Sequence, residues 1–325
     1  MKDLIPSEIL TVDLLEHPAA LAWNALQAQR VEPTEIQTLK RTNKSAVYRL
    51  LGAGPHGSSL IAKRCPIETA LTERLIYNRF LICLPLPSLK CYGFLEEEES
   101  QFQWLFLEDA GTQAYRSEQR EHGTLLAEWL AVLHTSAQEL LAADSLPDRG
   151  PAHFLKHLRL ARSKIQHYAG NPELTAEDCA LLAQILSHCD QVESRWDRIE
   201  NFCEAMPRTF VHGDLKEKNL RVRNSRQGLA LLCFDWETAG WGIPGSDLIK
   251  CPDLGRYITA AKATWPSLDQ GDFQRMYDVG ALFRALAVTH WECSHLEFQW
   301  LERPRITLSE CRARLTDSIR ILELN

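Results

Sequence analysis

The sequence predicts an α+β fold of two lobes, a small lobe on a mostly antiparallel sheet with one helix and a larger, mainly helical lobe. Three observations predict it. Short β-rich stretches fill residues 34–107, apolar residues recur at helical spacing from Leu125, and a brief return to β character near 209–234 divides the helical part. We place an N-terminal lobe at 1–108, with 1–30 as an added helical element, and a C-terminal lobe at 109–325.

The small lobe is expected to hold three strands, one helix and two further strands. Gly54-Pro55-His56-Gly57 is a turn signal between the second and third strands, and the prolines at Leu84-Pro85-Leu86-Pro87 end the helix. The acidic run Glu96–Glu99 is typical of a hairpin tip. The expected strands are Ile36–Leu39, Ala46–Leu51, Ser59–Lys63, Cys91–Leu95 and Phe102–Leu107, and the expected helix is 67–82. In the added element, the apolar positions are Leu14, Leu21, Trp23 and Leu26.

The large lobe is expected to be helical on both sides of a short β region. Leu125, Leu126, Trp129, Leu130 and Leu133 form one apolar stripe at helical spacing. The remaining elements are helices at 151–168 and 174–202, β stretches at Thr209–His212, Leu220–Val222 and Leu229–Phe234, and helices beyond Pro252. The predicted joint between the lobes lies near Asp109-Ala-Gly111, where a small ligand would bind.

Composition limits the classes of function. The chain carries 36 Lys and Arg against 43 Asp and Glu, a net charge of −7, which disfavours nucleic acid and mildly favours a neutral or cationic small partner. No apolar run approaches the roughly 20 residues of a membrane span, and no protein partner is evident. The ten cysteines form no C-x-x-C pair, so we expect reduced, mostly buried thiols and a cytoplasmic location.

One stretch carries the chemistry. In Val211-His212-Gly213-Asp214-Leu215-Lys216-Glu217-Lys218-Asn219, a short loop presents a carboxylate, a cation and an amide, and a hairpin then returns with the second carboxylate, Asp235. Phosphoryl transfer requires mainly positioning and charge neutralisation. Mg²⁺ takes one or two carboxylates together with phosphate oxygens. The pattern therefore offers Asp235 and Asn219 as oxygen ligands for Mg²⁺, close to the loop that carries the carboxylate of Asp214.

The pattern H-G-D-L-x-x-x-N followed by D-W-E resembles the aminoglycoside phosphotransferase family, which includes choline kinase-like enzymes and has a protein-kinase-like fold. The resemblance implies that Asp214 is the catalytic base, that His212 braces the loop, and that Asn219 and Asp235 bind Mg²⁺. Lys216 stands where the family more often has His. A Lys there approaches the γ-phosphate in protein kinases, so Lys216 is expected to be a phosphate contact or a surface charge.

The resemblance also places a nucleotide site in the small lobe. It implies that Lys63 holds the α- and β-phosphates and pairs with Glu73, with Glu68 as the competing partner. Phe106-Leu107-Glu108-Asp109 resembles the hinge whose backbone meets adenine. The phosphate-covering loop would be Arg41–Ser45, which has no glycine, so that Asn43 and Ser45 would serve instead. ATP is the expected nucleotide, and GTP is possible.

Further motifs resemble the supporting parts of the family. Leu126–His134 resembles a helix whose His packs within the large lobe, and Trp241–Leu248 resembles the segment whose Asp, here Asp247, anchors the catalytic loop from behind. Trp236 is expected in the core. Near the C-terminus, Trp291, Cys293 and Trp300 are expected either in the core or lining an acceptor pocket.

The expected function is ATP-dependent phosphorylation of a hydroxyl on a small molecule, such as an aminoglycoside-like compound, an amino alcohol or a sugar. The alternative is a non-catalytic binding protein that keeps the kinase-like fold, which the glycine-free loop favours and the intact set of Lys63, Asp214, Asn219 and Asp235 disfavours. A protein kinase is disfavoured because D-W-E replaces D-F-G and no A-P-E segment follows.

Overall fold

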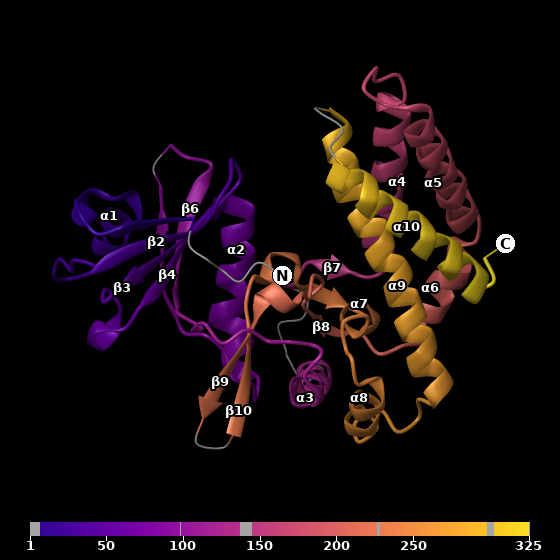
Figure 1. The fold of residues 1–325 in the computed structure, drawn as a ribbon. Coiled ribbons are helices and arrows are strands. Elements are labelled where there is room, and N and C mark those ends of the chain that lie inside the picture. The colour runs from indigo at the N-terminus through magenta and orange to yellow at the C-terminus, as the bar shows by residue number, and fades with distance from the viewer. Residues whose placement is uncertain (1–6, 98, 137–144, 226–227, 298–301, 325) are drawn as a thin grey trace. The chain divides into compact units, whose positions relative to one another are not determined.

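The computed structural model describes residues 7–97, 99–136, 145–225, 228–297 and 302–324. These residues form two compact units: unit 1 comprises the chain up to Trp129 together with Lys216–Thr238, and unit 2 comprises Leu130–Leu215 and the chain from Ala239 onward. Figure 1 colours the chain by residue number. The boundaries of the two units differ from those of the predicted lobes. The hairpin after the H-G-D loop belongs to unit 1 although it lies beyond residue 108, because a compact unit is defined by packing and not by chain order.

Unit 1 contains a six-stranded sheet in the order β1-β2-β3-β4-β6-β5, with every neighbouring pair antiparallel. Its strands are β1 (Glu8–Leu10), β2 (Glu35–Arg41), β3 (Ala46–Leu51), β4 (Leu60–Pro66), β5 (Cys91–Glu96) and β6 (Phe102–Glu108). A separate antiparallel pair, β9 (Leu220–Ser225) and β10 (Gly228–Cys233), completes the unit. The five strands predicted for the small lobe are all present.

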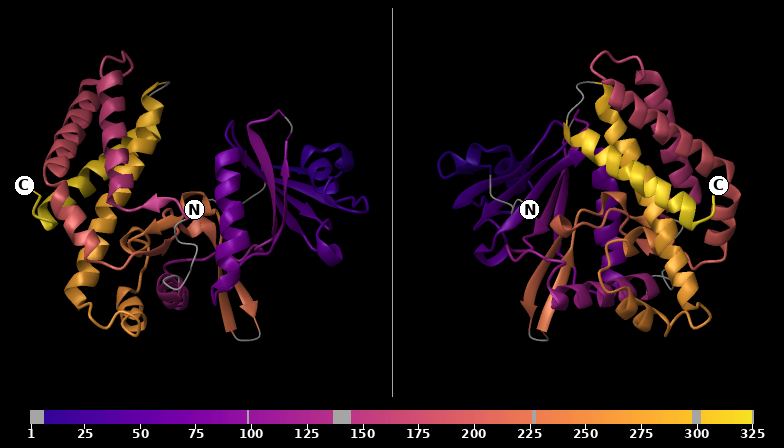
Figure 2. Two further views of the ribbon diagram at one scale, coloured as in Figure 1. Left: turned by 180° about the vertical axis from the view of Figure 1, so that it is seen from behind. Right: turned by 45° about the vertical axis from the view of Figure 1, so that its right-hand side comes forward.

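The two faces of the large sheet have different partners, because successive side chains of a strand point to opposite faces. Leu50, Leu60 and Phe106 lie on one face and pack with Trp23 of helix α1 (Pro18–Asn24). The other face carries Lys63 and adjoins helix α2 (Ile67–Leu75), whose Glu73 contacts Lys63. Figure 2 shows α2 lying along the sheet.

The added N-terminal element is only partly helical. Besides helix α1, the element contains β1, which pairs with β2 as an edge strand and was not predicted. Leu14 and Trp23 are buried as predicted, whereas Leu21 is 47% exposed and Leu26 is 36% exposed. Helix α1 is only seven residues long, so it presents only a narrow stripe to the sheet.

The predicted helix at 67–82 is not one regular α-helix. Helix α2 ends at Leu75, a π-helical turn follows at Ile76–Phe80, and a 3₁₀ turn at Leu81–Cys83 leads into the prolines. The wider π turn appears where Ile76, Tyr77 and Phe80 all face the core.

Unit 2 is mainly helical. Its helices are α4 (Pro151–Tyr168), α5 (Ala176–Ser194), α6 (Trp196–Glu204), α7 (Gly245–Leu248), α8 (Leu254–Ala261), α9 (Gln270–Glu292) and α10 (Glu302–Ile321). Helix α3 (Arg120–Ser136) continues from unit 1 into unit 2. A small sheet in the order β7-β11-β8 is formed by Asp148–Arg149, Gly240–Gly242 and Thr209–Val211.

The helix predicted at 151–168 is confirmed as α4, and the one at 174–202 is corrected to two helices. Thr175 and Asp178 form a capping box at the start of α5. The chain leaves helical geometry at Arg195, with φ −121° and ψ 20°, before α6 begins. Ile185, Val192 and Ile199 pack in one core with α4, α9 and α10, so both helices contribute to that core.

Helices α7 and α9 meet through two glycines, Gly245 and Gly280. A Cβ atom added to Gly280 would collide with the carbonyl oxygen of Gly245, and one added to Gly245 would collide with that of Met276. Backbone therefore packs against backbone at this contact, which only glycine allows. The contact fixes the helix that carries Asp247.

All ten cysteines are free thiols. Seven are buried and Cys91 is half-buried, while Cys83 in unit 1 and Cys179 in unit 2 are exposed. Burial raises the pKa of Cys65, Cys189 and Cys203 to about 12. These buried thiols pack as small apolar side chains.

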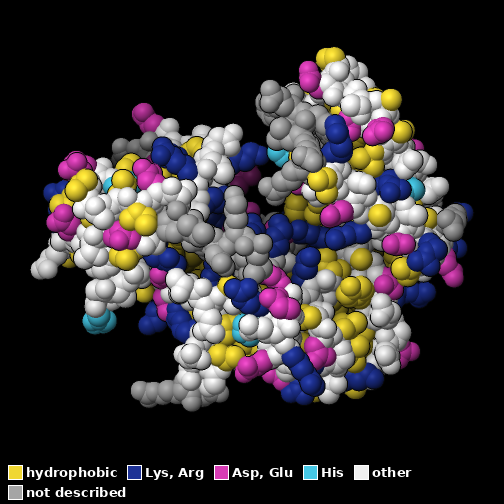
Figure 3. Space-filling view, in the orientation of Figure 1, with side chains coloured by type: hydrophobic (Ala, Val, Ile, Leu, Met, Phe, Trp, Pro, Cys, Tyr) yellow, Lys and Arg dark blue, Asp and Glu magenta, His cyan; other side chains and the backbone are white. Residues whose placement is uncertain are grey.

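No helix within the described residues is long and apolar enough to cross a membrane. Figure 3 shows one face of the molecule, on which acidic and basic side chains are interspersed. This agrees with the modest net charge of the sequence.

Candidate active site

Lys63 of β4 joins two carboxylates of unit 1. Its ammonium lies 2.8 Å from Oε1 of Glu73 and 2.6 Å from Oδ1 of Asp235. Glu73 is completely buried on α2, whereas Glu68 is exposed. The structure therefore selects Glu73 as the partner of Lys63.

The β9–β10 hairpin brings Asn219 and Asp235 together. Leu220, which begins β9, pairs with Cys233, which ends β10, and the amide of Phe234 donates to the carbonyl oxygen of Asn219. Asn219 and Asp235, which are 16 positions apart in the chain, therefore lie side by side at the base of the hairpin. Asp235 itself has a φ of 69°, a left-handed conformation that costs energy for any residue other than glycine and often marks a functional position.

A cavity of about 270 Å³ in unit 1 collects most of the predicted nucleotide-site residues. Lys63, Glu73, Glu108, Asn219 and Asp235 all line it, with apolar walls from Val47, Ile61 and Leu107. Apolar walls with a few convergent polar groups are typical of small-molecule sites. A more open hollow beside α3, lined by Arg120, Glu121 and Leu229, contains none of the predicted residues.

Four cationic residues that the sequence motifs did not indicate also line this cavity. They are Lys40, Arg49, Lys218 and Arg221. Arg49 forms an ion pair with Asp109 at 2.8 Å, and Arg223 forms one with Glu108 at 2.5 Å. Such cations suit a phosphate-bearing ligand. The only signal in the sequence that could have predicted Arg49 at this cavity is the alternation of side chains along β3.

Three residues predicted to contact the nucleotide are not among the residues that line the cavity. Phe106 is fully buried on the opposite face of the sheet, against Trp23 and Trp104, because its strand neighbour Leu107 takes the cavity face. Asn43 and Ser45 lie in the β2–β3 turn. There, Oγ1 of Thr42 accepts hydrogen bonds from the amides of Lys44 and Ser45.

Lys63 keeps its positive charge although it is buried in the cavity. Burial opposes its charged form, but Glu73 and Asp235 together raise the pKa of Lys63 well above its usual value. Burial raises the pKa of Glu73 from 4.5 to about 7, despite the opposing effect of Lys63. Oε2 of Glu73 has no hydrogen-bond partner among the described residues, and an unsatisfied buried oxygen favours the protonated acid.

The raised pKa of Glu73 predicts a pH-dependent stability. A proton binds Glu73 more tightly in the folded state than in the unfolded chain. The stabilisation from this group is therefore complete below pH 4.5 and is lost as the pH rises to about 7. Relative to Glu73→Gln, the free energy of unfolding of the wild type should fall between pH 5 and 7, by at most about 1.4 kcal/mol per pH unit. Denaturant unfolding at several pH values measures this difference. Glu68→Gln, on the exposed side of the same helix, should show no such trend, and a wild-type advantage that stays constant or grows with pH would contradict the prediction.

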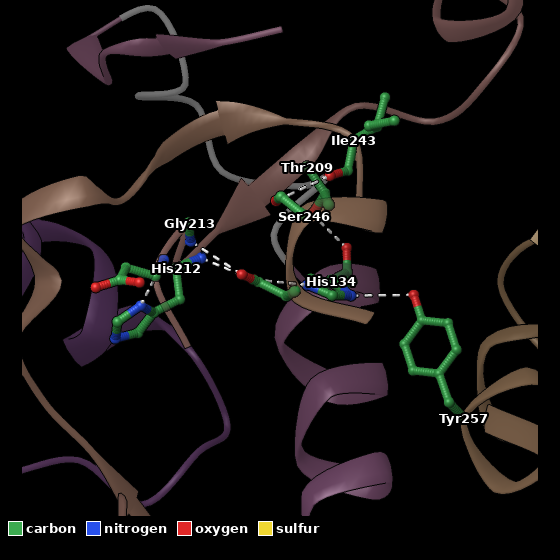
Figure 4. Close-up of polar contacts among 9 residues, drawn as sticks. His134, Thr209, His212, Gly213, Ile243, Ser246 and Tyr257 are labelled. Carbon is green, nitrogen blue, oxygen red and sulfur yellow. Dashed lines mark hydrogen bonds and ion pairs between the residues drawn. The ribbon is translucent and has the colours of Figure 1, made fainter. Parts of the chain in front are cut away.

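In unit 2, the H-G-D loop is held by a buried carboxylate. Oδ2 of Asp247 accepts from the amide of His212 at 2.8 Å, and its Oδ1 accepts from the amide of Gly213 at 2.9 Å. The ring of His134 lies 3.3 Å from Asp247 and 3.0 Å from the hydroxyl of Tyr257. Figure 4 shows His134, His212 and Gly213 gathered around the carboxylate to which their dashed lines lead.

These contacts keep Asp247 ionised in the core. Burial alone would favour its neutral form, but hydrogen bonds from His134 and the loop backbone lower its pKa below the usual value. The expectation that His134 packs within the helical part agrees with its complete burial. Two oriented backbone amides and one charged acceptor give the loop a single conformation.

Asp214 stands at the end of this braced loop and is half-buried. Its amide donates to Nδ1 of His212 at 3.3 Å, so His212 supports the loop from within. Its carboxylate forms an ion pair with Nη1 of Arg284, a residue of α9 that no motif indicated. Lys216 is half-buried and lies just before a 3₁₀ turn at Glu217–Asn219.

A family model described as "Phosphotransferase enzyme family" matches residues 35–291 of the chain. The chain belongs to this family. The match spans β2 to the end of α9 and includes every residue of the site described above. It confirms the resemblance and the class of protein, a phosphotransferase that acts on small molecules. No curated protein sequence matches the chain.

Solved structures share the fold of this phosphotransferase at low sequence identity. A spectinomycin phosphotransferase, in complex with ADP and spectinomycin, has a TM-score of 0.58 at 11% identity, covering 91% of this chain and 95% of its own. The GDP and kanamycin complex of APH(2″)-IIia has a TM-score of 0.59 at 12% identity, covering 94% and 99%. A choline kinase from Cryptosporidium parvum has a TM-score of 0.57 at 13% identity, covering 88% of each chain. These likenesses confirm the kinase-like α+β fold.

Proposed function

We propose that this phosphotransferase moves the γ-phosphoryl group of ATP to a hydroxyl of a small-molecule alcohol. The observation that carries the proposal is the position of Lys63, which bridges Glu73 and Asp235 in a cavity that Asn219 also lines. An ammonium group held by two carboxylates beside an apolar wall suits a nucleotide whose base lies against the wall and whose phosphates meet the charge.

The residues present fit a magnesium ion. Asp235 offers a carboxylate and Asn219 an amide oxygen at the base of one hairpin, and both residues line the cavity. The sequence predicted no other pair of magnesium ligands there. Mg²⁺ commonly takes one or two protein oxygens and completes its shell with phosphate and water. When bound there, the ion would neutralise charge on the transferring phosphoryl group.

Each protein group then has one task. Lys63 binds the α- and β-phosphates, and Glu73 holds Lys63 in place. Asp214 accepts the proton of the acceptor hydroxyl as that oxygen bonds to the γ-phosphorus and the bond to the β-phosphate oxygen breaks, which releases ADP. Asp247 positions Asp214 through the amides of His212 and Gly213. Lys216 is proposed as a contact of the γ-phosphate.

Nucleotide binding with and without Mg²⁺ tests the proposal directly. We expect ATP to raise the midpoint of thermal unfolding, because a ligand at about one hundred times its Kd stabilises the native state by about 2.7 kcal/mol. The part of this shift that depends on Mg²⁺ should be largely lost in Asp235→Asn. Titrating GTP in parallel establishes the preferred nucleotide.

Asp13→Asn is a matched control for Asp235→Asn. Asp13 also has a left-handed backbone, with a φ of 54°, and is exposed in unit 1. Its substitution should leave the magnesium-dependent shift intact. If neither nucleotide shifts the wild type, the transferase proposal fails, and a non-catalytic protein with this fold becomes the better account. Phosphate would then fail to bind because the amides of Lys44 and Ser45 already donate to Oγ1 of Thr42.

A further inference from the structure

A continuous row of side chains leads away from Asp214 across α4 and α9. The guanidinium of Arg284, paired with Asp214, lies 5.3 Å from the ring centre of Trp291, and the Trp291 ring meets His157 edge to face at 5.9 Å. The side chain of Arg284 makes no other hydrogen bond to a described residue. Its remaining N–H donors are therefore available to a ligand.

Three histidines extend this row. Nδ1 of His157 lies 2.8 Å from Nδ1 of His290, and its Nε2 lies 3.2 Å from Nε2 of His153. All three rings are half-buried. Within the described part of the chain, they do not form a group suited to holding a metal ion.

The surroundings of these histidines are cationic. Burial lowers the pKa of His157 to about 3, and its neighbours His153 and His290, with Arg149 and Lys156, add to this effect. Burial also lowers the pKa of His290 to about 4, with Lys164 and Lys156 contributing. The rings are thus neutral at pH 7 and serve as hydrogen-bonding groups, while the charge nearby is positive.

Among the described residues, Asp214 and Asp148 act on these side chains, and each is itself paired with an arginine. Among the described residues, Asp214 is the only carboxylate paired with Arg284. Asp148 raises the pKa of His153 but forms its own ion pair with Arg208. The surface beside the proposed base therefore attracts anions locally, although the whole chain carries a net charge of −7.

We propose that the acceptor is an anionic polyol, an alcohol that also carries a carboxylate or phosphate group. Arg284 would bind that oxyanion beside Asp214, and Nε2 of His290, the ring nitrogen that does not face His157, would hydrogen-bond another hydroxyl. The inference rests on the proposed function and names its acceptor class. It reverses the expectation, drawn from net charge alone, of a neutral or cationic partner, because local charge governs the binding of a small molecule.

Four open-chain six-carbon polyols test the inference. Sorbitol is neutral, gluconate carries a carboxylate, sorbitol 6-phosphate carries a phosphate, and N-methylglucamine carries a cation. Calorimetric titration of the full chain at constant ionic strength should give gluconate or sorbitol 6-phosphate a Kd at least about tenfold below that of sorbitol, the effect of one charged hydrogen bond. Whichever of the two anions has the lower Kd shows whether the acceptor carries a carboxylate or a phosphate. N-methylglucamine should bind most weakly.

Substitutions test which residues cause the preference for anionic probes. Arg284→Gln should remove the preference for the anionic probe, and Lys164→Met should weaken it in a variant that keeps the pair between Arg284 and Asp214. Arg275→Gln is the matched control, because Arg275 lies on the same helix but is exposed against Phe202, and it should leave the preference unchanged.

The inference is overturned if neither anionic probe binds better than sorbitol, including the case in which none binds, or if N-methylglucamine binds best. It is also overturned if the preference survives both Arg284→Gln and Lys164→Met. MgATP binding, measured in the same samples, separates these outcomes from failure of the proposed function. An enzyme that binds MgATP and phosphorylates only cationic alcohols would keep that function and exclude the anionic acceptor.

Discussion

Asp214→Asn is expected to lower kcat by about 10²- to 10⁴-fold, the usual contribution of a positioned general base. Asparagine keeps the shape of the side chain but cannot accept the proton of the acceptor hydroxyl. The loop should stay in place, because Asp247 holds it through the backbone amides of His212 and Gly213 and not through Asp214 itself. Steady-state kinetics with saturating MgATP measures the change.

Two further measurements make this result interpretable. The Kd for MgATP should remain near its wild-type value in Asp214→Asn, since Lys63 and Asp235 are unchanged, whereas the midpoint of thermal unfolding should fall, because the buried Arg284 loses its charged partner. Retention of more than about a tenth of wild-type kcat would remove Asp214 from the role of base, given the size of this catalytic effect.

Gly280→Ala should destabilise unit 2 by about 3 kcal/mol or more, at the upper end of the cost of overpacking. The new methyl group would collide with the carbonyl oxygen of Gly245, and backbone cannot rotate away as a side chain can. Relief requires α7 to move away from α9. Because α7 carries Asp247, we also expect kcat to fall in whatever fraction remains folded. Denaturant unfolding of the purified variant gives the change in stability.

Gly255→Ala provides the control for this substitution. Gly255 lies in α8, where an added Cβ meets only an oxygen of Asp253 at 3.8 Å. Alanine there should be neutral or stabilising by about 0.5 to 1 kcal/mol, because it reduces the entropy of the unfolded chain. A Gly280→Ala variant as stable as Gly255→Ala would mean that the close packing of α7 on α9 contributes nothing.

The strands of the small lobe could be predicted because their apolar residues alternate and their turns carry Gly and Pro. The same alternation could have shown that Phe106 and Leu107 face opposite sides of the sheet, which separates a core residue from a cavity residue. Strand β1 could not be foreseen, because three residues are too few for a pattern. The break at Arg195 was equally hidden, since the apolar positions continue through it.

The residues of the candidate site could be predicted from the sequence for a different reason. Asp214, Asn219 and Asp235 could be found because a short loop and a hairpin fix their spacing in the chain. Glu73 could be separated from Glu68 only by the structure, because both lie on one helix and burial distinguishes them. Arg284, His157 and His290 carried no signal, since their proximity arises from the packing of α4 and α9 and not from any local motif.

The distribution of thiols in the fold has a practical consequence. Eight of the ten cysteines are buried or half-buried, and the two exposed ones, Cys83 and Cys179, belong to different units. Alkylating reagents attack the thiolate, which burial suppresses. The natural chain should therefore accept a pair of spectroscopic labels, one on each unit, without any engineered substitution. The distance between such labels, followed as nucleotide and acceptor are added, would report whether the separation of the two units changes on binding.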